Sequence, residues 1–222
     1  TLTLTRIDCV AGDGITIFWG DGTSNSYTSA NNGTTKTHAY SGAGTWNVKI
    51  ANPLNFSLIS LSDSKLTNFN SNQFLKCGDN LYFLNLTELG SNPTINSSHF
   101  AHLKLTTTLY LTFSSAGTYY INSEHFKNYT LNNTIQLCFY TQGTYIINTA
   151  HFKNYTVHFL YNLCFNTTNL TKTISRSDFT LYRVPTVTIH MGLTQAEVDA
   201  VLLGFYDAFP SKTNTGGTIN LN

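Results

Sequence analysis

One phenylalanine position recurs at a constant interval through the middle of this 222-residue chain. The interval is 26 residues for the first four members and 27 for the fifth: Phe74, Phe100, Phe126, Phe152 and Phe179. An asparagine position keeps the same interval: Asn70, Asn96, Asn122 and Asn148. This period predicts a repeat protein, because a single short unit cannot bury its apolar side alone and must stack on its neighbours.

Each repeat also contains a short run in which apolar residues alternate with other residues. The runs are Leu109-Leu111-Phe113, Ile135-Leu137-Phe139, Tyr161-Leu163-Phe165 and, less regularly, Val187-Ile189-Met191. A period of two predicts one strand per repeat with one face buried, and stacked repeats would place equivalent strands about 4.8 Å apart. We therefore expect residues 53–192 to form a solenoid with a parallel sheet along one side.

The repeat unit reads I-N-x-x-[HQD]-F-x-x-[LY]-x-[LV], followed by a short loop and then Φ-x-L-x-F, where Φ is apolar. This pattern resembles the leucine-rich repeats of the BspA-like type, in which an I-x-x-x-x-F turn precedes a short L-x-L strand. The Asn, Tyr and Thr content is heavier here, and the I-P step of that family is absent. The resemblance implies a leucine-rich-repeat-like solenoid.

Residues 1–52 are predicted to form a small antiparallel β unit. Three motifs follow in order: W-G-D-G at 19–22, H-A-Y at 38–40 and G-T-W-N-V at 44–48. Together they resemble the polycystic kidney disease (PKD) type of immunoglobulin-like domain, which implies a small β-sandwich acting as a spacer or binding module without catalysis. The unit is shorter than that family, so we expect a sandwich strand to be missing or supplied by the neighbouring segment.

Residues 193–222 are predicted to form a cap that covers the open end of the solenoid. Thr194 and Glu197 form a capping box that predicts a helix start, and Pro210 predicts its end. An apolar stripe follows the helical period: Val198, Val201, Leu202, Phe205 and Phe209. The G-G-T-I-N-L run at 216–221 predicts one more strand. This segment resembles the ends of repeat-bearing proteins from gut bacteroidetes and their crAss-like tailed phages.

The composition restricts the partners. With 12 basic and 11 acidic residues the net charge is +1, and only 10% of residues are charged against a usual share of about a quarter. Nucleic acid is not expected as a partner, because its binding depends on basic charge. Membrane insertion is not expected either, since no apolar run approaches about 18 residues. The first ten residues lack the layout of a signal peptide, and a chain that begins at Thr1 is compatible with a processed piece.

Three histidines share one column of the repeat: His99, His125 and His151. A hydrogen-bonded turn position is favoured over a metal site, because ligands in a row do not converge on one tetrahedral ion. If they stand in a row, protonating one disfavours protonation of the next, and stability should fall below about pH 6. We expect no metal and no cofactor.

Cys138 and Cys164 share another column, between the inward-facing positions of the strand. Free thiols are favoured over a disulfide, because in-register parallel neighbours present awkward vectors for one. In the W-G-D-G turn, Asp21 is expected to stabilise the turn rather than bind calcium, which takes six to eight oxygen ligands. Trp19 and Trp46 are expected to belong to the core rather than to a ligand platform.

The candidate binding residues are two tyrosine columns: Tyr119 with Tyr145, and Tyr129 with Tyr155. Aromatic faces beside amides suit sugar binding, because the apolar C–H patches of a sugar stack on rings. The alternative is that the second column belongs to the core, since Leu103 occupies the equivalent position in an earlier repeat.

Catalysis has little support, because the sequence lacks the G-x-S-x-G, H-E-x-x-H and P-loop motifs. The leading hypothesis is a non-enzymatic structural and binding protein of a phage virion, located in a fibre, a tail or a capsid decoration. The alternative is a bacterial cell-surface adhesin, and a glycan-active enzyme is a remote third because it needs two facing carboxylates. The expected partners are other structural proteins or a host-surface glycan or protein, and we expect a homo-oligomer.

Overall fold

Strands dominate the regular structure in the computed structural model of this chain. It describes residues 1–63, 65–66, 69–87, 90, 93–157, 159–166, 168–179, 186–208 and 218–221. Within these residues the strands form four sheets, and one α-helix lies near the C-terminus. The prediction of a mainly β protein with a C-terminal helix is confirmed.

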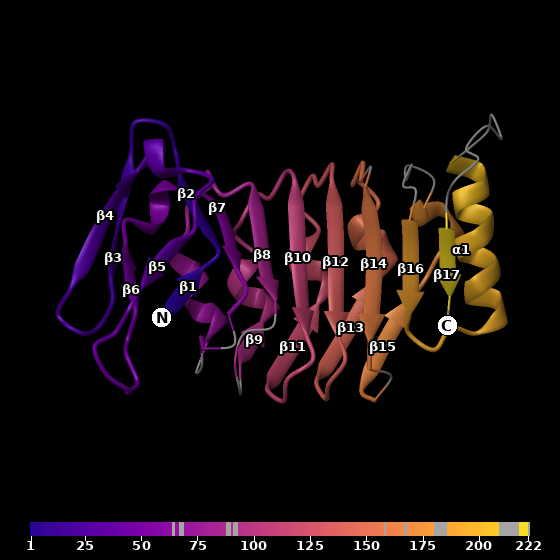
Figure 1. The fold of residues 1–222 in the computed structure, drawn as a ribbon. Helices are drawn as coiled ribbons and strands as arrows, with labels where there is room; N and C mark the ends of the chain where they lie inside the picture. Colours follow the sequence, from indigo (N-terminus) through magenta and orange to yellow (C-terminus); the bar gives the residue numbers. More distant parts are fainter. Residues whose placement is uncertain are drawn as a thin grey trace.

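The largest sheet, called the long sheet here, has the strand order β17-β16-β14-β12-β10-β8-β7-β2 (Figure 1). Its strands are β2 (Arg6–Cys9), β7 (Phe56–Leu61), β8 (Phe83–Thr87), β10 (Thr108–Phe113), β12 (Thr134–Phe139), β14 (Leu160–Phe165), β16 (Thr186–His190) and β17 (Thr218–Leu221). All neighbours are parallel except β2 and β7, which are antiparallel. The predicted parallel sheet is therefore present.

Equivalent residues of successive repeats pair directly in the long sheet. Leu111 is the Cα partner of Leu137, and Leu137 is the partner of Leu163. All three are fully buried, and so are the neighbouring members of the alternating runs, among them Leu109, Phe113, Ile135, Phe139 and Tyr161. Full burial of one such side chain contributes roughly 1.5–3 kcal/mol to the stability of the folded state. The core is thus built from ladders in which each apolar residue lies beside its own counterpart.

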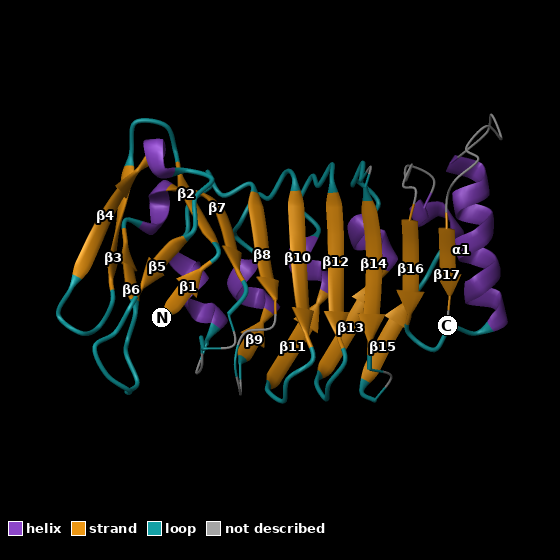
Figure 2. Cartoon of the chain, viewed as in Figure 1, coloured by secondary structure: helices purple, strands orange, loops and turns teal. Residues whose placement is uncertain are grey.

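A second parallel sheet runs along the repeats in the order β15-β13-β11-β9. Its strands are β9 (Thr94–Asn96), β11 (Thr118–Asn122), β13 (Thr144–Asn148) and β15 (Leu170–Thr173). Each leads into a short 3-10 helix, and an earlier helix of the same kind precedes β8 (Figure 2): η3 (Ser71–Lys76), η4 (Ser97–Phe100), η5 (Ser123–Phe126), η6 (Thr149–Phe152) and η7 (Arg176–Phe179).

The 3-10 helices explain the two columns that revealed the repeat. In each of the first four, the recurring asparagine stands just before the helix, and its side-chain oxygen accepts from the backbone N–H two residues later at 3.0 Å. This is the capping role that Asn fills well. The recurring phenylalanine is buried in every helix, with Phe100, Phe126 and Phe152 fully buried.

The N-terminal segment forms two further sheets and also contributes to the long sheet. β1 (Leu2–Leu4) pairs with β5 (Lys36–His38), and β3 (Gly14–Phe18) lies between β4 (Ser24–Thr28) and β6 (Lys49–Ala51). Two short 3-10 helices complete the segment: η1 (Ser29–Asn31) and η2 (Pro53–Asn55). Because β2 pairs with β7 across the predicted boundary at residue 52, the segment and the repeats share one sheet.

The two tryptophans of this segment differ in burial. Trp19 is fully buried, as expected, and its indole N–H donates to Asn25 Oδ1 at 2.7 Å. Trp46 is 37% exposed, which corrects the expectation that it belongs to the core. Trp46 precedes β6 instead of lying in a strand, so its ring packs flat on Tyr40 at the surface, with the centroids 5.1 Å apart.

The C-terminal helix α1 (Gln195–Ala208) begins at the predicted capping box, where Glu197 Oε2 accepts from Thr194 N at 2.7 Å. Val201 and Phe205 of α1 are buried. An ion pair between Arg176 of η7 and Asp207 of α1 also joins the two helices. Leu202, predicted to share the apolar stripe, is 44% exposed because the helix packs by its Val201 edge. Phe209 and Pro210 lie outside the described residues.

β17 adds the predicted last strand to the long sheet by pairing with β16. The helix α1 stands at the same end of the molecule (Figure 1). None of the helices in the described part of the chain has the length and apolar character needed to cross a membrane.

Candidate binding face

The four tyrosines proposed from sequence as a sugar-binding surface are buried. Tyr119 is 3% exposed, and Tyr129, Tyr145 and Tyr155 are at or below 1%. Their hydroxyls donate to backbone carbonyls, for example from Tyr129 to Phe100 O at 2.8 Å. A ring enclosed on both faces cannot stack on a ligand, so these residues belong to the core and the prediction of an exposed surface at these positions is wrong.

The histidine column is a set of hydrogen-bonded turns, as predicted. His99 Nδ1 lies 3.0 Å from Ser71 Oγ of the preceding repeat, and His151 Nδ1 lies 2.8 Å from Ser123 Oγ. Each serine oxygen also accepts a backbone N–H from the next repeat, at 2.8 to 2.9 Å. Within the described residues, no group of three or more His, Cys, Asp or Glu side chains is placed to hold one metal ion.

Asp21 stabilises its turn, as expected. Its Oδ1 accepts from the backbone and hydroxyl of Thr23 at 3.0 and 2.6 Å, and its Oδ2 lies 2.7 Å from His38 Nε2. The hydrogen bonds from Thr23, and then that from His38, lower the pKa of Asp21 to about 2. The ring of His38 stacks on Trp19 with the centroids 4.8 Å apart. The W-G-D-G and H-A-Y motifs are therefore parts of one contact network.

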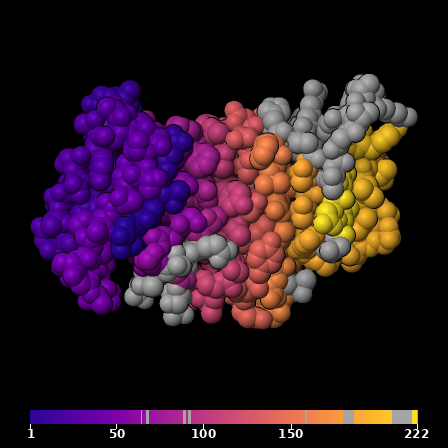
Figure 3. All heavy atoms as spheres, viewed as in Figure 1, coloured from indigo at the N-terminus to yellow at the C-terminus, as the bar shows by residue number. Residues whose placement is uncertain are grey.

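No described strand or helix forms a further layer on the side of the long sheet opposite the apolar core; we name this side the outer face. In the space-filling view, no segment from either end of the chain lies over its middle (Figure 3). From β7 to β17 its strand positions are Leu58, Ser60, Phe83, Asn85, Thr87, Thr108, Tyr110, Thr112, Thr134, Gln136, Cys138, Leu160, Asn162, Cys164, Thr186, Thr188, His190 and Asn220.

The outer face has no Lys, Arg, Asp or Glu at these described strand positions. On β2, at the edge of the sheet, Arg6 Nε donates to Asp8 Oδ2 at 2.7 Å, so these two charges largely cancel. The positions are occupied mainly by amides and hydroxyls. The outer face is therefore a polar surface without net charge, in contrast to the apolar ladders on the other side of the same strands.

Amide and hydroxyl groups of the outer face are joined from strand to strand. Gln136 Nε2 donates to Thr112 Oγ1 at 2.7 Å, and Asn162 Nδ2 donates to Gln136 Oε1 at 3.3 Å. Gln136 is 6% exposed, whereas Thr112 and Asn162 on either side are half-buried. Gln136 thus fixes the orientation of two more accessible polar side chains.

An exposed aromatic residue stands beside the two cysteines of this face. Tyr140 follows β12 and is 55% exposed, and its hydroxyl lies close to the thiols of Cys138 and Cys164. Both cysteines are buried and free, as predicted. The neighbouring Cys164 sulfur, together with burial, raises the pKa of the Cys138 thiol, so it stays protonated at neutral pH.

Several polar atoms of the outer face have no hydrogen-bond partner. They are Asn85 Oδ1, Thr108 Oγ1 and His190 Nε2, each enclosed by its neighbours. An enclosed polar atom left without a partner is destabilising. A large majority of buried polar groups in proteins are paired, so three such atoms on one face call for an explanation.

Sequence reasoning missed the outer-face residues although a signal was present. In Φ-x-L-x-F the two x positions must face away from the core. They hold Tyr110 and Thr112 in β10, and Gln136 and Cys138 in β12. Only the cysteines were assigned to this side of the sheet.

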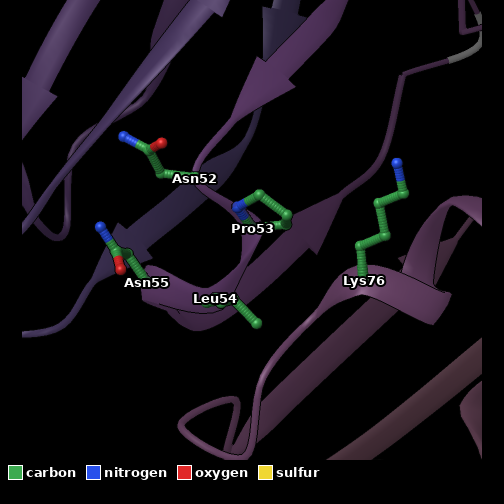
Figure 4. A pocket seen from close by; sticks show the side chains of 5 residues that line it. All are labelled: Asn52, Pro53, Leu54, Asn55 and Lys76. Carbon is green, nitrogen blue, oxygen red and sulfur yellow. The ribbon is translucent and has the colours of Figure 1, made fainter.

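Two hollows open where the N-terminal segment meets the first repeat. One has a volume of about 710 Å³ and is lined mainly by apolar side chains such as Ile7, Phe56 and Phe74. The other, of about 700 Å³, lies between the turn at 52–55 and Lys76 of η3 (Figure 4). Among the described residues that line the two hollows none is a carboxylate, so these residues do not supply the carboxylate pair that glycoside hydrolysis uses.

The outer face is therefore the candidate site, because it combines uncharged polar side chains, amides oriented by hydrogen bonds and the exposed ring of Tyr140. The arrangement suits binding of a polar, uncharged partner. Comparisons of this chain with protein-family models, with curated proteins and with solved structures found no match.

Proposed function

We propose that this chain is a non-enzymatic structural and binding protein of a phage virion, located in a fibre, a tail or a capsid decoration. The observation that carries the proposal is the uncharged outer face, held on parallel strands whose equivalent residues pair from repeat to repeat. Such stacking gives an extended surface whose shape depends on neighbour contacts alone. The partners are other structural proteins or a host-surface glycan or protein, and the chain acts as a homo-oligomer.

The proposal includes a finer description of the fold. We assign residues 53–192 to a solenoid of leucine-rich-repeat-like coils of the BspA-like type, and residues 1–52 to a PKD-like unit. The 26-residue register of the strands supports the first assignment. The contacts among Trp19, Asp21, His38 and Tyr40 support the second, because they join the motifs on which that resemblance depends.

A bacterial cell-surface adhesin is the second candidate. It is favoured by the same pairing of a PKD-like unit with leucine-rich-like repeats, which is a natural architecture for a displayed binding protein. The two candidates share the outer face and differ in where the protein resides.

Location is therefore the experiment that tests the proposal. Mass spectrometry of purified tailed-phage particles and of bacterial cell envelopes should find the chain in the particles, at a copy number fixed relative to other virion proteins. Recovery from envelopes alone would favour the adhesin. Recovery from neither fraction would contradict both candidates.

A further inference from the structure

We propose that the outer face binds an uncharged glycan chain that crosses β10, β12 and β14, with about one sugar ring to each strand. The chain would contact Tyr110, Asn162 and Tyr140. This inference rests on the proposed binding function and names its ligand class.

The charge of the outer face selects the ligand class. The described strand positions from β7 to β17 have no ionic side chain that would pair with sulfate, phosphate or carboxylate groups. Placing an anion there would remove its hydration without supplying a counter-charge. Neutral hydroxyls, by contrast, exchange water for amide and hydroxyl partners at little cost. A neutral glycan fits this surface better than an acidic polysaccharide, a nucleic acid or a charged peptide.

The amides supply the hydrogen bonds. Asn162 uses one amide hydrogen toward Gln136, and its amide group carries a second. The Asn162 oxygen accepts from the Cys164 thiol at 2.8 Å, which fixes the orientation of the amide. Thr112 is held in the same way by Gln136. Because these groups are oriented before any ligand arrives, binding costs little side-chain entropy.

Tyr140 supplies the stacking surface. Tyr140 is 55% exposed at the end of β12, so an aromatic surface is available above the sheet. An exposed ring of this kind suits the C–H face of a pyranose. Tyr110, the Cα partner of Gln136, is half-buried one strand away.

The repeat spacing matches the ligand. Neighbouring parallel strands lie about 4.8 Å apart, which is close to the length of one pyranose unit in an extended chain. Equivalent positions on successive strands thus meet successive sugar rings. Asn85, the Cα partner of Tyr110 on β8, continues this row of positions by one more strand. Affinity should therefore increase with chain length.

The test uses the full chain and calorimetry with neutral oligosaccharides of mannan, cellulose and galactan, from monosaccharide to hexasaccharide. Sulfated and uronic-acid oligosaccharides of equal length are the charged comparison. We expect at least one neutral series to bind, with affinity rising from the disaccharide onward, and the charged series to bind at least about tenfold more weakly, which is 1.4 kcal/mol.

Variants locate the site. Tyr140→Ala and Asn162→Ala should each weaken binding about tenfold or more, and Tyr140→Phe should retain most of it because the ring remains. The control is Tyr120→Ala, which removes a partly exposed tyrosine (37%, against 55% for Tyr140) from the second sheet and should leave binding unchanged. Melting curves of each variant show whether the fold is intact, and Tyr140→Phe separates loss of the ring from loss of the hydroxyl.

Three outcomes would overturn the inference: no binding of any neutral series at millimolar concentration, tighter binding of the charged series, or neutral binding that survives in folded Tyr140→Ala and Asn162→Ala variants. Footprinting that shows a protein partner protecting the outer face, with no glycan bound, would also overturn the inference. That result would leave the proposed function in place. Release of shortened products from the oligosaccharides would instead contradict the non-enzymatic function.

Discussion

The Oγ atom of Ser97 lies 2.7 Å from Nδ1 of His125, a residue of the next repeat. The same oxygen accepts the backbone N–H of Asn122 at 2.9 Å. At the last position of the series, Thr149 donates to Asp178 Oδ2 at 2.6 Å, so the hydroxyl there acts as the donor. These hydroxyls join the repeats by polar contacts beneath the second sheet.

Ser97→Ala should destabilise the protein by about 1–3 kcal/mol, because the backbone N–H of Asn122 and Nδ1 of His125 both lose their hydrogen bond to the fully buried Ser97 hydroxyl. Urea unfolding measures the change. Thr118→Ala, at an exposed position of β11, is the matched control and should change stability by less than about 0.5 kcal/mol. Equal effects of the two substitutions would show that the hydroxyl series contributes nothing.

Acidification should destabilise the fold once the pH falls below the unfolded histidine pKa of about 6.5. Burial lowers the pKa of His125 and of His151; Glu124 opposes this shift and Lys127 reinforces it, while Asp178 also opposes it at His151. Since the folded state disfavours protonation, the stabilisation is complete above the unfolded pKa near 6.5 and is lost as pH falls through the lower folded value. Melting temperatures at pH 8, 6 and 5 test this, and a flat profile would contradict it.

Tyr155→Phe should cost about 1–2 kcal/mol while leaving every surface property unchanged. Its buried hydroxyl donates to Phe126 O at 2.6 Å, and the substitution leaves that carbonyl without this partner. Tyr120→Phe, which removes a hydroxyl from a more exposed ring, is the comparison in thermal unfolding. If Tyr155→Phe changed ligand binding and left the melting temperature unchanged, the structural role of Tyr155 would be contradicted.

Gly117→Ala should destabilise by about 1–3 kcal/mol, because a Cβ at this position would lie 2.5 Å from the backbone oxygen of Pro93 in the preceding repeat. Gly42→Ala is the control, since nothing lies within 4 Å of its added carbon. Denaturant midpoints of the two variants give the comparison. If Gly117→Ala melted like Gly42→Ala, the repeats would be less tightly stacked at this turn than the distances indicate.

The repeat architecture could be predicted because stacking gives equivalent residues equivalent surroundings. Leu111, Leu137 and Leu163 face the same core, so the same residue type satisfies all three positions and the period becomes visible. The helix start at Thr194 was predictable for a local reason, since the capping box depends only on residues three apart.

The tyrosine columns could not be assigned in the same way. Tyrosine suits a surface or a core equally well, provided that its hydroxyl finds a partner. For Tyr129 the partner is Phe100 O, 29 residues away, which only the stacked structure reveals. The same limit applies to Trp46, whose ring stacks on Tyr40 from another part of the N-terminal segment.

The antiparallel pairing of β2 with β7 gives the long sheet a beginning that differs from its repeating interior. At that edge a further repeat would not meet a strand of the repeating, parallel kind. Between β10 and β14, by contrast, each strand pairs with the next in the same parallel register. Duplication or deletion of one 26-residue unit within the interior would therefore change the length of the molecule and preserve both ends. Length is the property that evolution can adjust most easily in such a chain, by unequal exchange between its own repeats.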